Sequence, residues 1–169
     1  QRAALDAAIR EYRRAQAFNA DRVEARANLG TLESRLGNTT AAQTAFDAAI
    51  RLQPSFSPAY VELADLLRRQ DREGDAEALL RRGLKESPED GALHEALGLS
   101  LVRQHRLPDA LSELTRAAKL APDTPRYAYV HAVALHDTGD LPGAIAALTK
   151  AHERFPGVHD LVLVLVQYE

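Results

Sequence analysis

The sequence predicts an all-α protein, an α-α superhelix (solenoid) of antiparallel helical hairpins, and three observations support this fold class. Prolines recur at a constant interval of 34 residues, at Pro54, Pro88, Pro122 and Pro156, and self-similarity at such a period is typical of repeat architectures. Columns of small and of large apolar residues follow the same period. Within each half-repeat, apolar residues recur at steps of three and four, which indicates helices rather than strands.

The aligned columns indicate where the two helices of a hairpin pack closely. Small residues fill three columns: Gly30, Ala64, Gly98 and Ala132; Ala42, Ala76, Ala110 and Ala144; and Ala49, Gly83, Ala117 and Ala151. Large residues fill two more: Leu29, Leu63, Leu97 and, as the exception, His131; and Phe46, Leu80, Leu114 and Leu148. A small residue at a helix crossing lets the backbones approach, while a large neighbour fills the groove. We therefore expect one buried seam in every hairpin.

Turn and capping residues delimit the elements in order. We expect helices at residues 4–18, 23–36, 40–52, 58–70, 74–86, 91–104, 108–120, 125–138, 142–154 and 159–168. Ser57-Pro58 and Thr124-Pro125 each place a capping residue before a proline suited to the first helical position. Thr40 with Gln43 predicts a capping box. Gly37-Asn38 and Gly139-Asp140 tolerate a left-handed backbone, which suits the turn inside a hairpin.

The period predicts how the chain is organised as a single array of repeats. Residues 1–22 correspond to the second helix of a partial repeat, and residues 159–169 to the first helix of a truncated one. The full repeats are expected at 23–56, 57–90, 91–124 and 125–158. Because the chain opens on Gln1 inside a helical pattern, we interpret it as part of a longer protein.

The chain resembles the tetratricopeptide repeat (TPR) family over essentially its whole length. The residues that carry the resemblance in the clearest repeat are Asn28-Leu29-Gly30, Ala42, Phe46, Ala49 and Pro54. The large aromatic residue that the family carries early in the first helix is missing at Arg26 and Ala128. The resemblance implies a non-catalytic scaffold for protein–protein interaction, with a concave groove lined mainly by the first helix of every hairpin.

The groove residues that the resemblance implies change in character along the chain. They are Asn28, Thr31, Arg35, Glu62, Asp65, Arg69, Glu95, Leu99, Val102, Arg103, Tyr129, Val133 and His136. The earlier portion is polar with both signs of charge, whereas the later portion is apolar with an aromatic anchor at Tyr129. A protein or peptide ligand with an apolar segment, extended or helical, suits such a groove.

One subset of the family clamps the C-terminal carboxylates of chaperones with lysines and asparagines on successive first helices. The matching positions here hold Ala27, Thr31, Glu62, Ala92 and Ala96. The sequence therefore argues against chaperone-tail capture.

Composition excludes several other classes of function. The 169 residues are 46% hydrophobic and 27% charged, which predicts a soluble folded chain. The sequence leaves the compartment open between cytoplasm and periplasm. The net charge of -3 gives no overall positive field for nucleic acid. The absence of cysteine removes disulfides, thiolate metal sites and covalent haem attachment within this chain. No apolar run approaches the roughly 18 residues of a spanning helix, so we expect no membrane insertion.

The sequence predicts no catalytic residues, no metal site and no cofactor. Its six histidines do not form pairs four residues apart on one helix: His94, His105, His131, His136, His152 and His159. His131 occupies a leucine column, so we expect a satisfied, largely buried histidine rather than a ligand. Glu62 and Asp65 share a helix face, but no nucleophile or oxyanion donor accompanies them.

Two alternatives to a peptide-binding scaffold remain at this stage. The run Tyr127-Ala128-Tyr129-Val130-His131-Ala132 is similar to repeat tails of some bacterial multihaem cytochromes, which implies an accessory region of a larger redox protein. The other alternative is an architectural, self-associating module. In that case we expect a homodimer in which Val162, Leu165 and Val166 meet a copy of themselves or the opening helix, at Leu5, Ile9 and Tyr12.

Overall fold

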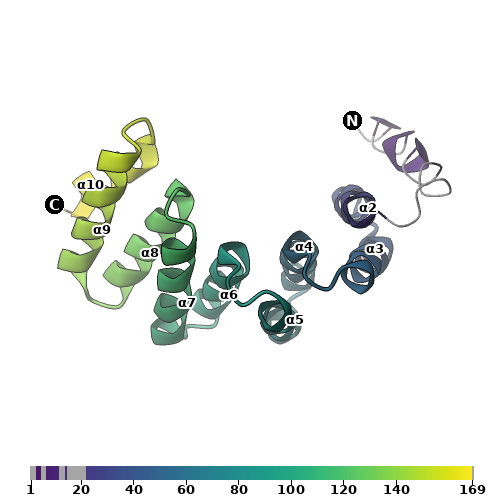
Figure 1. Cartoon of the computed structure of the whole chain (residues 1–169), viewed down its shortest axis with the longest axis horizontal. Helices are drawn as coiled ribbons and strands as arrows, with labels where there is room; N and C mark the ends of the chain where they lie inside the picture. Colours follow the sequence, from purple (N-terminus) through teal and green to yellow (C-terminus); the bar gives the residue numbers. More distant parts are fainter. Residues whose placement is uncertain (1–2, 5–6, 12–13, 15–21, 169) are drawn as a thin grey trace. The chain divides into compact units, whose positions relative to one another are not determined.

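The computed structural model describes residues 3–4, 7–11, 14 and 22–168, and every regular element in this part of the chain is an α-helix. In chain order (Figure 1) these are α2 (Val23–Arg35), α3 (Thr39–Leu52), α4 (Ser57–Arg68), α5 (Glu73–Glu86), α6 (Gly91–Arg103), α7 (Leu107–Leu120), α8 (Pro125–Asp137), α9 (Leu141–Arg154) and α10 (His159–Tyr168). The prediction of an all-α helical-repeat solenoid is therefore confirmed.

The helix bounds expected from the sequence agree with the structure to within two residues at each end from residue 22 onwards. The largest difference is at α4, which ends at Arg68 rather than at residue 70. The alternating Leu and Val residues of 161–166 lie in α10, so they form a helix and not a strand. Residues 3–4, 7–11 and 14 are helical, and the remainder of the helix predicted for 4–18 lies outside the described residues.

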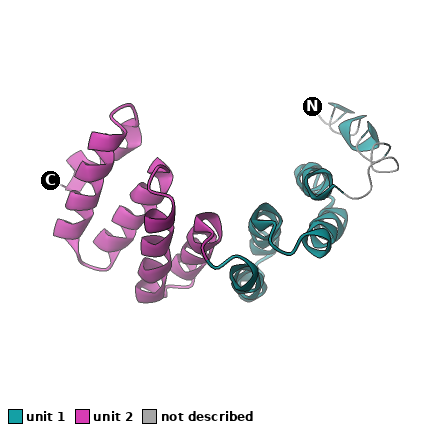
Figure 2. Cartoon of the chain, viewed as in Figure 1, with its two compact units in different colours: residues 1–88 teal, residues 89–169 magenta. Residues whose placement is uncertain are grey.

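The chain divides into two compact units, residues 1–88 and residues 89–169, which Figure 2 shows in different colours. In the first unit α2 packs against α3, α3 against α4, and α4 against α5. In the second unit α6 packs against α7, α7 against α8, α8 against α9, and α9 against α10. Each unit is thus built from successive helical hairpins, whose first helices are α2 and α4 in one and α6 and α8 in the other.

The predicted seam is buried in every hairpin except at His131, which is partly exposed. The large seam residues of the second helices are at most 2% exposed: Phe46, Leu80, Leu114 and Leu148. A Cβ atom on Gly30 would lie 2.6 Å from the ring of Phe46, and one on Gly98 would lie 2.6 Å from the side chain of Leu114. Glycine at these two positions therefore lets the first helix approach the large residue of the second helix.

The turn inside each hairpin contains one residue in the left-handed conformation. Gly37 and Gly139 have φ angles of 81° and 91°, as their sequence context predicts. The corresponding turns of the other hairpins hold Asp71 and His105, with φ angles of 58° and 59°. In all four turns the amide of this residue donates a hydrogen bond to the carbonyl three positions earlier. Asp71 and His105 were not predicted in this role, although they stand 34 and 68 residues after Gly37.

The predicted caps are partly wrong. Thr124 precedes α8, but its side chain makes no capping hydrogen bond, and α4 begins at Ser57, so that Phe56 occupies the N-cap position. The capping box of Thr40 is wrong as well, because Asn38 stands at the N-cap of α3 and makes no side-chain cap. Side-chain caps occur instead at α6 and α9, where aspartates accept amide hydrogen bonds: Asp90 from Ala92 at 2.9 Å and Leu93 at 3.0 Å, and Asp140 from Gly143 at 2.9 Å.

Candidate peptide-binding surface

In the first unit, the predicted groove residues lie on α2, on α4 and directly after the end of α4, and we call them the polar surface. It comprises Asn28, Thr31, Arg35, Glu62, Asp65 and Arg69. All are exposed except Thr31, which is partly buried and whose hydroxyl donates a hydrogen bond to the carbonyl of Ala27 at 3.2 Å. The polar surface carries both signs of charge, because two carboxylates and two guanidinium groups stand on it.

Internal bonds already occupy part of the polar surface. The guanidinium of Arg69 donates a hydrogen bond to the hydroxyl of Ser34 at 2.6 Å, which joins the end of α4 to α2. Asp65 forms an ion pair with Arg68 at 3.1 Å on the same helix. Asn28 borders a hollow of about 440 Å³ with Arg22, Glu24 and Ala25 at the start of α2.

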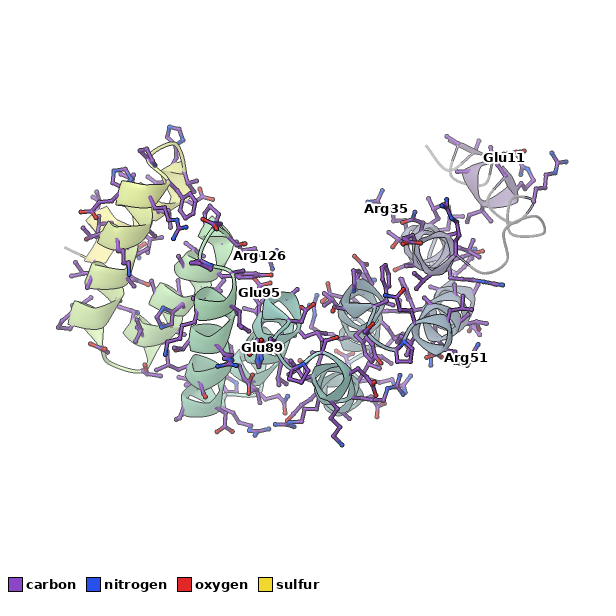
Figure 3. The ribbon with its side chains drawn as sticks, in the orientation of Figure 1. Glu11, Arg35, Arg51, Glu89, Glu95 and Arg126 are labelled. Atoms are coloured by element: carbon purple, nitrogen blue, oxygen red, sulfur yellow. The ribbon has the colours of Figure 1, made fainter. Side chains whose placement is uncertain are left out.

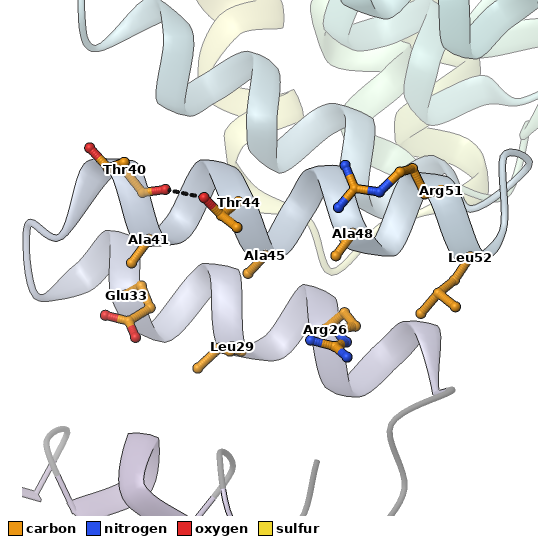
Figure 4. A pocket seen from close by; sticks show the side chains of 10 residues that line it. All are labelled: Arg26, Leu29, Glu33, Thr40, Ala41, Thr44, Ala45, Ala48, Arg51 and Leu52. Atoms are coloured by element: carbon orange, nitrogen blue, oxygen red, sulfur yellow. Dashed lines mark hydrogen bonds between the residues drawn. The ribbon is translucent and has the colours of Figure 1, made fainter. Parts of the chain in front are cut away.

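A second hollow in this unit, of about 780 Å³, lies along α2 and α3 (Figure 4). It borders Arg26, one of the two positions where the family's aromatic residue is missing, together with Leu29 and Ala45. Leu29 and Ala45 cluster with the buried Ile9. This finding corrects the expectation that Ile9 is exposed on the opening helix, while Leu5 and Tyr12 lie outside the described residues.

In the second unit, the predicted apolar residues are partly exposed on α6 and α8. Leu99 and Val102 lie three residues apart on α6, and Tyr129 and Val133 lie four residues apart on α8, so each pair shares a helix face. We call these four residues the apolar surface. The exposed Arg103 follows Val102 at the end of α6.

Glu95 is buried, whereas its predicted role as a groove contact requires an exposed side chain. It is only 8% exposed, and its carboxylate accepts a hydrogen bond from the guanidinium of Arg126 at 2.5 Å. Figure 3 shows this pair, which joins α6 to the first turn of α8. Arg126, whose side chain is 67% exposed, was missed from the sequence because only the tertiary structure reveals that the first helices of successive hairpins meet there.

Tyr129 has a structural role as well as an exposed edge. It packs against the buried cluster of Ala132, Leu148, Ala151 and Leu161. We therefore expect Tyr129→Ala to weaken folding together with binding.

His136 lies beside an aromatic residue that the sequence did not predict for the site. Its ring stacks on that of Tyr168 from α10, with centroids 4.3 Å apart and an angle of 8° between the planes. The Nδ1 atom of His136 lies 3.1 Å from the Asp137 carboxylate. Burial raises the pKa of Tyr168, and the nearby Asp137 and Tyr129 raise this pKa further. These residues lie where α8 and α10 meet. The signal in the sequence was an aromatic residue, Tyr168, at the end of the last predicted helix.

His131 is not the satisfied, largely buried histidine that its leucine column predicts. It is partly exposed, and its ring makes no hydrogen bond within the described part of the chain. Burial lowers the pKa of His131, and the charge of Lys119 lowers this pKa further. A histidine ring in this environment remains neutral to a lower pH than it does in water.

No group of three His, Cys, Asp or Glu side chains in the described part of the chain is arranged to hold a metal ion. The carboxylate of Asp65, which shares a helix face with Glu62, is held by Arg68. Among the helices of residues 22–168, none combines the length and apolarity that crossing a membrane requires.

Solved structures of repeat proteins share this fold. A thermophilic TPR protein of Thermus thermophilus, TTC0263, has a TM-score of 0.76 and 23% identity, covering 97% of this chain and 90% of that chain. YrrB, described as a TPR protein with an unusual peptide-binding site, has a TM-score of 0.67 and 23% identity, covering 89% and 77%. MamA of Desulfovibrio magneticus has a TM-score of 0.70 and 20% identity, covering 91% and 87%.

Sequence comparisons identify the family. A search of curated proteins found no match. The sequence profile of the tetratricopeptide repeat matches residues 27–91 and 95–159, which together make up more than half of the chain. Proteins built from this repeat bind peptides or other proteins and are generally non-catalytic scaffolds. The chain belongs to the tetratricopeptide repeat family.

Proposed function

We propose that this protein is a protein- or peptide-binding scaffold that holds a segment of its partner on the exposed faces of its first helices. The observation that carries the proposal is the apolar surface of the second unit, where Leu99 and Val102 on α6 and Tyr129 and Val133 on α8 remain partly exposed. Covering these side chains with a partner removes apolar area from water, which is the main favourable term in association.

Neighbouring charges favour a partner segment with a mixed polar and apolar sequence. Arg103 and Arg126 both lie exposed in the second unit, at the end of α6 and the start of α8. Rim charges of this kind contribute more to orientation and to the association rate than to affinity. The polar surface of the first unit, with Glu62 and Arg35 exposed, suits a charged segment.

The proposal includes a non-catalytic role. A scaffold needs surfaces that bury area on binding, whereas an enzyme needs titratable groups with matched pKa values in an enclosed site. Two of the three carboxylates of the predicted groove and its histidine engage in structural bonds: Asp65 with Arg68, Glu95 with Arg126, and His136 with Asp137. These bonds support a binding role in preference to acid–base chemistry.

A peptide library tests the proposal without knowledge of the natural partner. Random peptides displayed on phage are selected on the intact chain, and the tightest binder is titrated by calorimetry against wild type and Leu99→Ala. The matched control is Leu141→Ala, because Leu141 is 41% exposed on α9, outside the proposed surface. We expect Leu99→Ala to weaken binding about tenfold, as an anchor near the centre of an interface does, and Leu141→Ala to leave it unchanged. Equal affinity of wild type and Leu99→Ala would place the binding site elsewhere.

We also propose that the chain self-associates through α10. Leu163 and Val166 are each 68% exposed and lie three residues apart, so they share one face of this helix. Of the residues expected at a dimer contact, Val166 is exposed, whereas Val162 is partly buried and Leu165 packs against the buried cluster of the second unit. The contact therefore centres on Leu163 and Val166, with a second copy as the partner.

Light scattering over a concentration series tests self-association. Wild type is compared with Leu163→Glu and with Gln167→Glu, which adds the same charge at an exposed polar position of α10. We expect the mass of wild type and Gln167→Glu to rise with concentration and Leu163→Glu to remain a monomer. A monomeric wild type at the highest concentration would remove the proposal.

A further inference from the structure

The last two hairpins differ at one pair of equivalent positions, one early in the first helix and one in the second helix. In the α6–α7 hairpin these positions hold His94 and Glu113, whose side chains lie 2.6 Å apart as a hydrogen-bonded pair. They border a hollow of about 440 Å³ whose lining side chains are all polar or charged. In the α8–α9 hairpin they hold Ala128 and Ala147. Ala128 stands where the family carries a large aromatic residue, so two small side chains replace a bulky pair at this place.

A hollow of about 250 Å³ lies at this place, and we call it the α8–α9 hollow. Its apolar lining comes from three helices and from the turns after α7 and α9: Ala118, Pro122, Ala128, Ala147, Ala151 and Phe155. Pockets for drug-sized ligands enclose about 300–1,000 Å³. The α8–α9 hollow therefore suits one aromatic ring or a short aliphatic chain.

The charged and titratable groups of the α8–α9 hollow are all cationic or basic. Lys119, Lys150 and Arg154 line it together with His131, and no acidic side chain is among the lining residues. Arg154 forms an ion pair with Asp123, whereas the two lysines form none within the described part of the chain. The exposed Lys119 and Lys150 beside this apolar hollow make a local positive potential, although the net charge of the chain is -3.

The position and the lowered pKa of His131 agree with a hollow that is positively charged and partly shielded from water. His131 stands in the column that Leu29, Leu63 and Leu97 fill elsewhere. Burial and the charge of Lys119 both lower the pKa of His131. A leucine at this position would add apolar bulk, whereas the imidazole offers a polar ring edge inside the hollow.

We propose that the α8–α9 hollow binds an apolar carboxylate, with the ring or chain of the ligand against Ala128 and Ala147 and its carboxylate near Lys119 and Lys150. The site is separate from the surface proposed above for the partner segment, because none of the predicted groove residues lines it. The same chemistry occurs in a free organic acid and in a peptide where a phenylalanine precedes a glutamate. Binding requires both the apolar body and the negative charge.

Ligand-observed NMR titrations of the intact chain test the proposal, with phenylpropionate as the free acid and phenylpropanol as its uncharged analogue. A short capped peptide containing Phe-Glu is the second probe and distinguishes the two sources of the ligand. We expect phenylpropionate or the peptide to bind, and phenylpropanol to bind about fivefold more weakly than phenylpropionate, which is the range of an exposed ion pair. If phenylpropionate and the peptide both fail to bind, the proposal is wrong.

Variants locate the binding within the hollow. Ala128→Tyr restores the family's aromatic residue and Ala147→Leu fills the facing position, so each should abolish binding while the helical circular dichroism is retained. Lys119→Glu should weaken the binding of phenylpropionate at least about fivefold. Its matched control is Lys85→Glu, because the exposed Lys85 stands one repeat earlier at the same position and outside the hollow. Unchanged binding by Ala147→Leu and Lys119→Glu, or equal loss in Lys85→Glu, would overturn the assignment.

Discussion

The α4 and α8 helices each begin the second hairpin of their unit, yet they bury different amounts of side chain. Of the 12 residues of α4, the buried ones are Ser57, Ala59, Tyr60, Leu63, Ala64, Leu66 and Leu67. Of the 13 residues of α8, the buried ones are Ala132 and Ala134. Both helices keep the small residue of the seam, Ala64 in α4 and Ala132 in α8. Hairpins that share the small residue of the seam can therefore bury different amounts of the rest of their first helix.

The largest expected effect is on the free energy of unfolding, when the tyrosines of α4 and α8 are each replaced by alanine. Tyr60 is 1% exposed in α4, whereas Tyr129 is partly exposed in α8. We expect Tyr60→Ala to lower the free energy of unfolding by about 3–5 kcal/mol, and Tyr129→Ala by about 1–2 kcal/mol, since loss grows with the cavity left behind. Urea denaturation of both variants measures the difference. Equal losses would mean that α8 is as tightly packed as α4.

The next prediction compares two leucines of α6. Leu97 is 2% exposed in the seam, and Leu99 is partly exposed on the apolar surface. We expect Leu97→Ala to cost about 2–5 kcal/mol. Leu99→Ala should cost less than half as much, because its side chain keeps contact with water in the folded state. An unchanged denaturation midpoint for Leu97→Ala would contradict the seam.

A smaller effect concerns His131, the exception in the leucine column. Because burial lowers the pKa of His131 from its ordinary value of 6.5, the unfolded chain takes up this proton at a higher pH than the folded protein does. The stability that His131 contributes is therefore complete above about pH 6.5 and falls as the pH drops below that value. We expect His131→Leu to raise stability by about 1 kcal/mol at neutral pH through added apolar burial, and by more at about pH 5. Melting temperatures of wild type and variant across this range give the comparison, and a constant difference would contradict the assigned pKa direction.

The smallest effects concern the backbone of two turns inside hairpins and of the first turn of α5. Gly37 has a positive φ and open space around a Cβ, so Gly37→Ala should destabilise by about 1 kcal/mol through its backbone alone. Gly74 lies in the first turn of α5 with equally open space, so Gly74→Ala should stabilise by roughly 0.5–1 kcal/mol. His105→Gly should stabilise by a similar amount, because glycine removes the strain of a φ of 59°. Thermal denaturation of the three variants gives the signs, and a stabilising Gly37→Ala would contradict the turn assignment.

Most of the fold was predictable from the sequence because the repeat is a local, periodic pattern. The prolines at intervals of 34 residues and the small residues of the seam set the helix bounds to within two residues. Turns at Asp71 and His105 lacked the usual glycine, so only their register with Gly37 would have revealed them. The prediction that Ser57 and Thr124 cap their helices was wrong, because residue type alone does not decide whether a hydroxyl reaches a backbone amide.

The candidate site was less predictable because its residues interact across helices. Glu95 is typical of an exposed groove residue in the sequence, but the ion pair with Arg126 depends on how α6 and α8 meet. The stacking of His136 on Tyr168 likewise depends on the position of α10. The sequence shows that a small side chain, Ala128, replaces the family's large aromatic residue. The hollow at this place could be found only from the structure, because residues of α7, α8 and α9 line it together.

The most direct test of the proposed binding role is an NMR footprint of a library-selected peptide on the isotopically labelled chain. We expect the largest amide shift changes at residues 99–103 of α6 and 129–136 of α8. The amides of Ser112 and Thr149, which lie on the second helices α7 and α9, should change least. Shift changes concentrated on α7 and α9 would contradict the proposal that the first helices hold the partner.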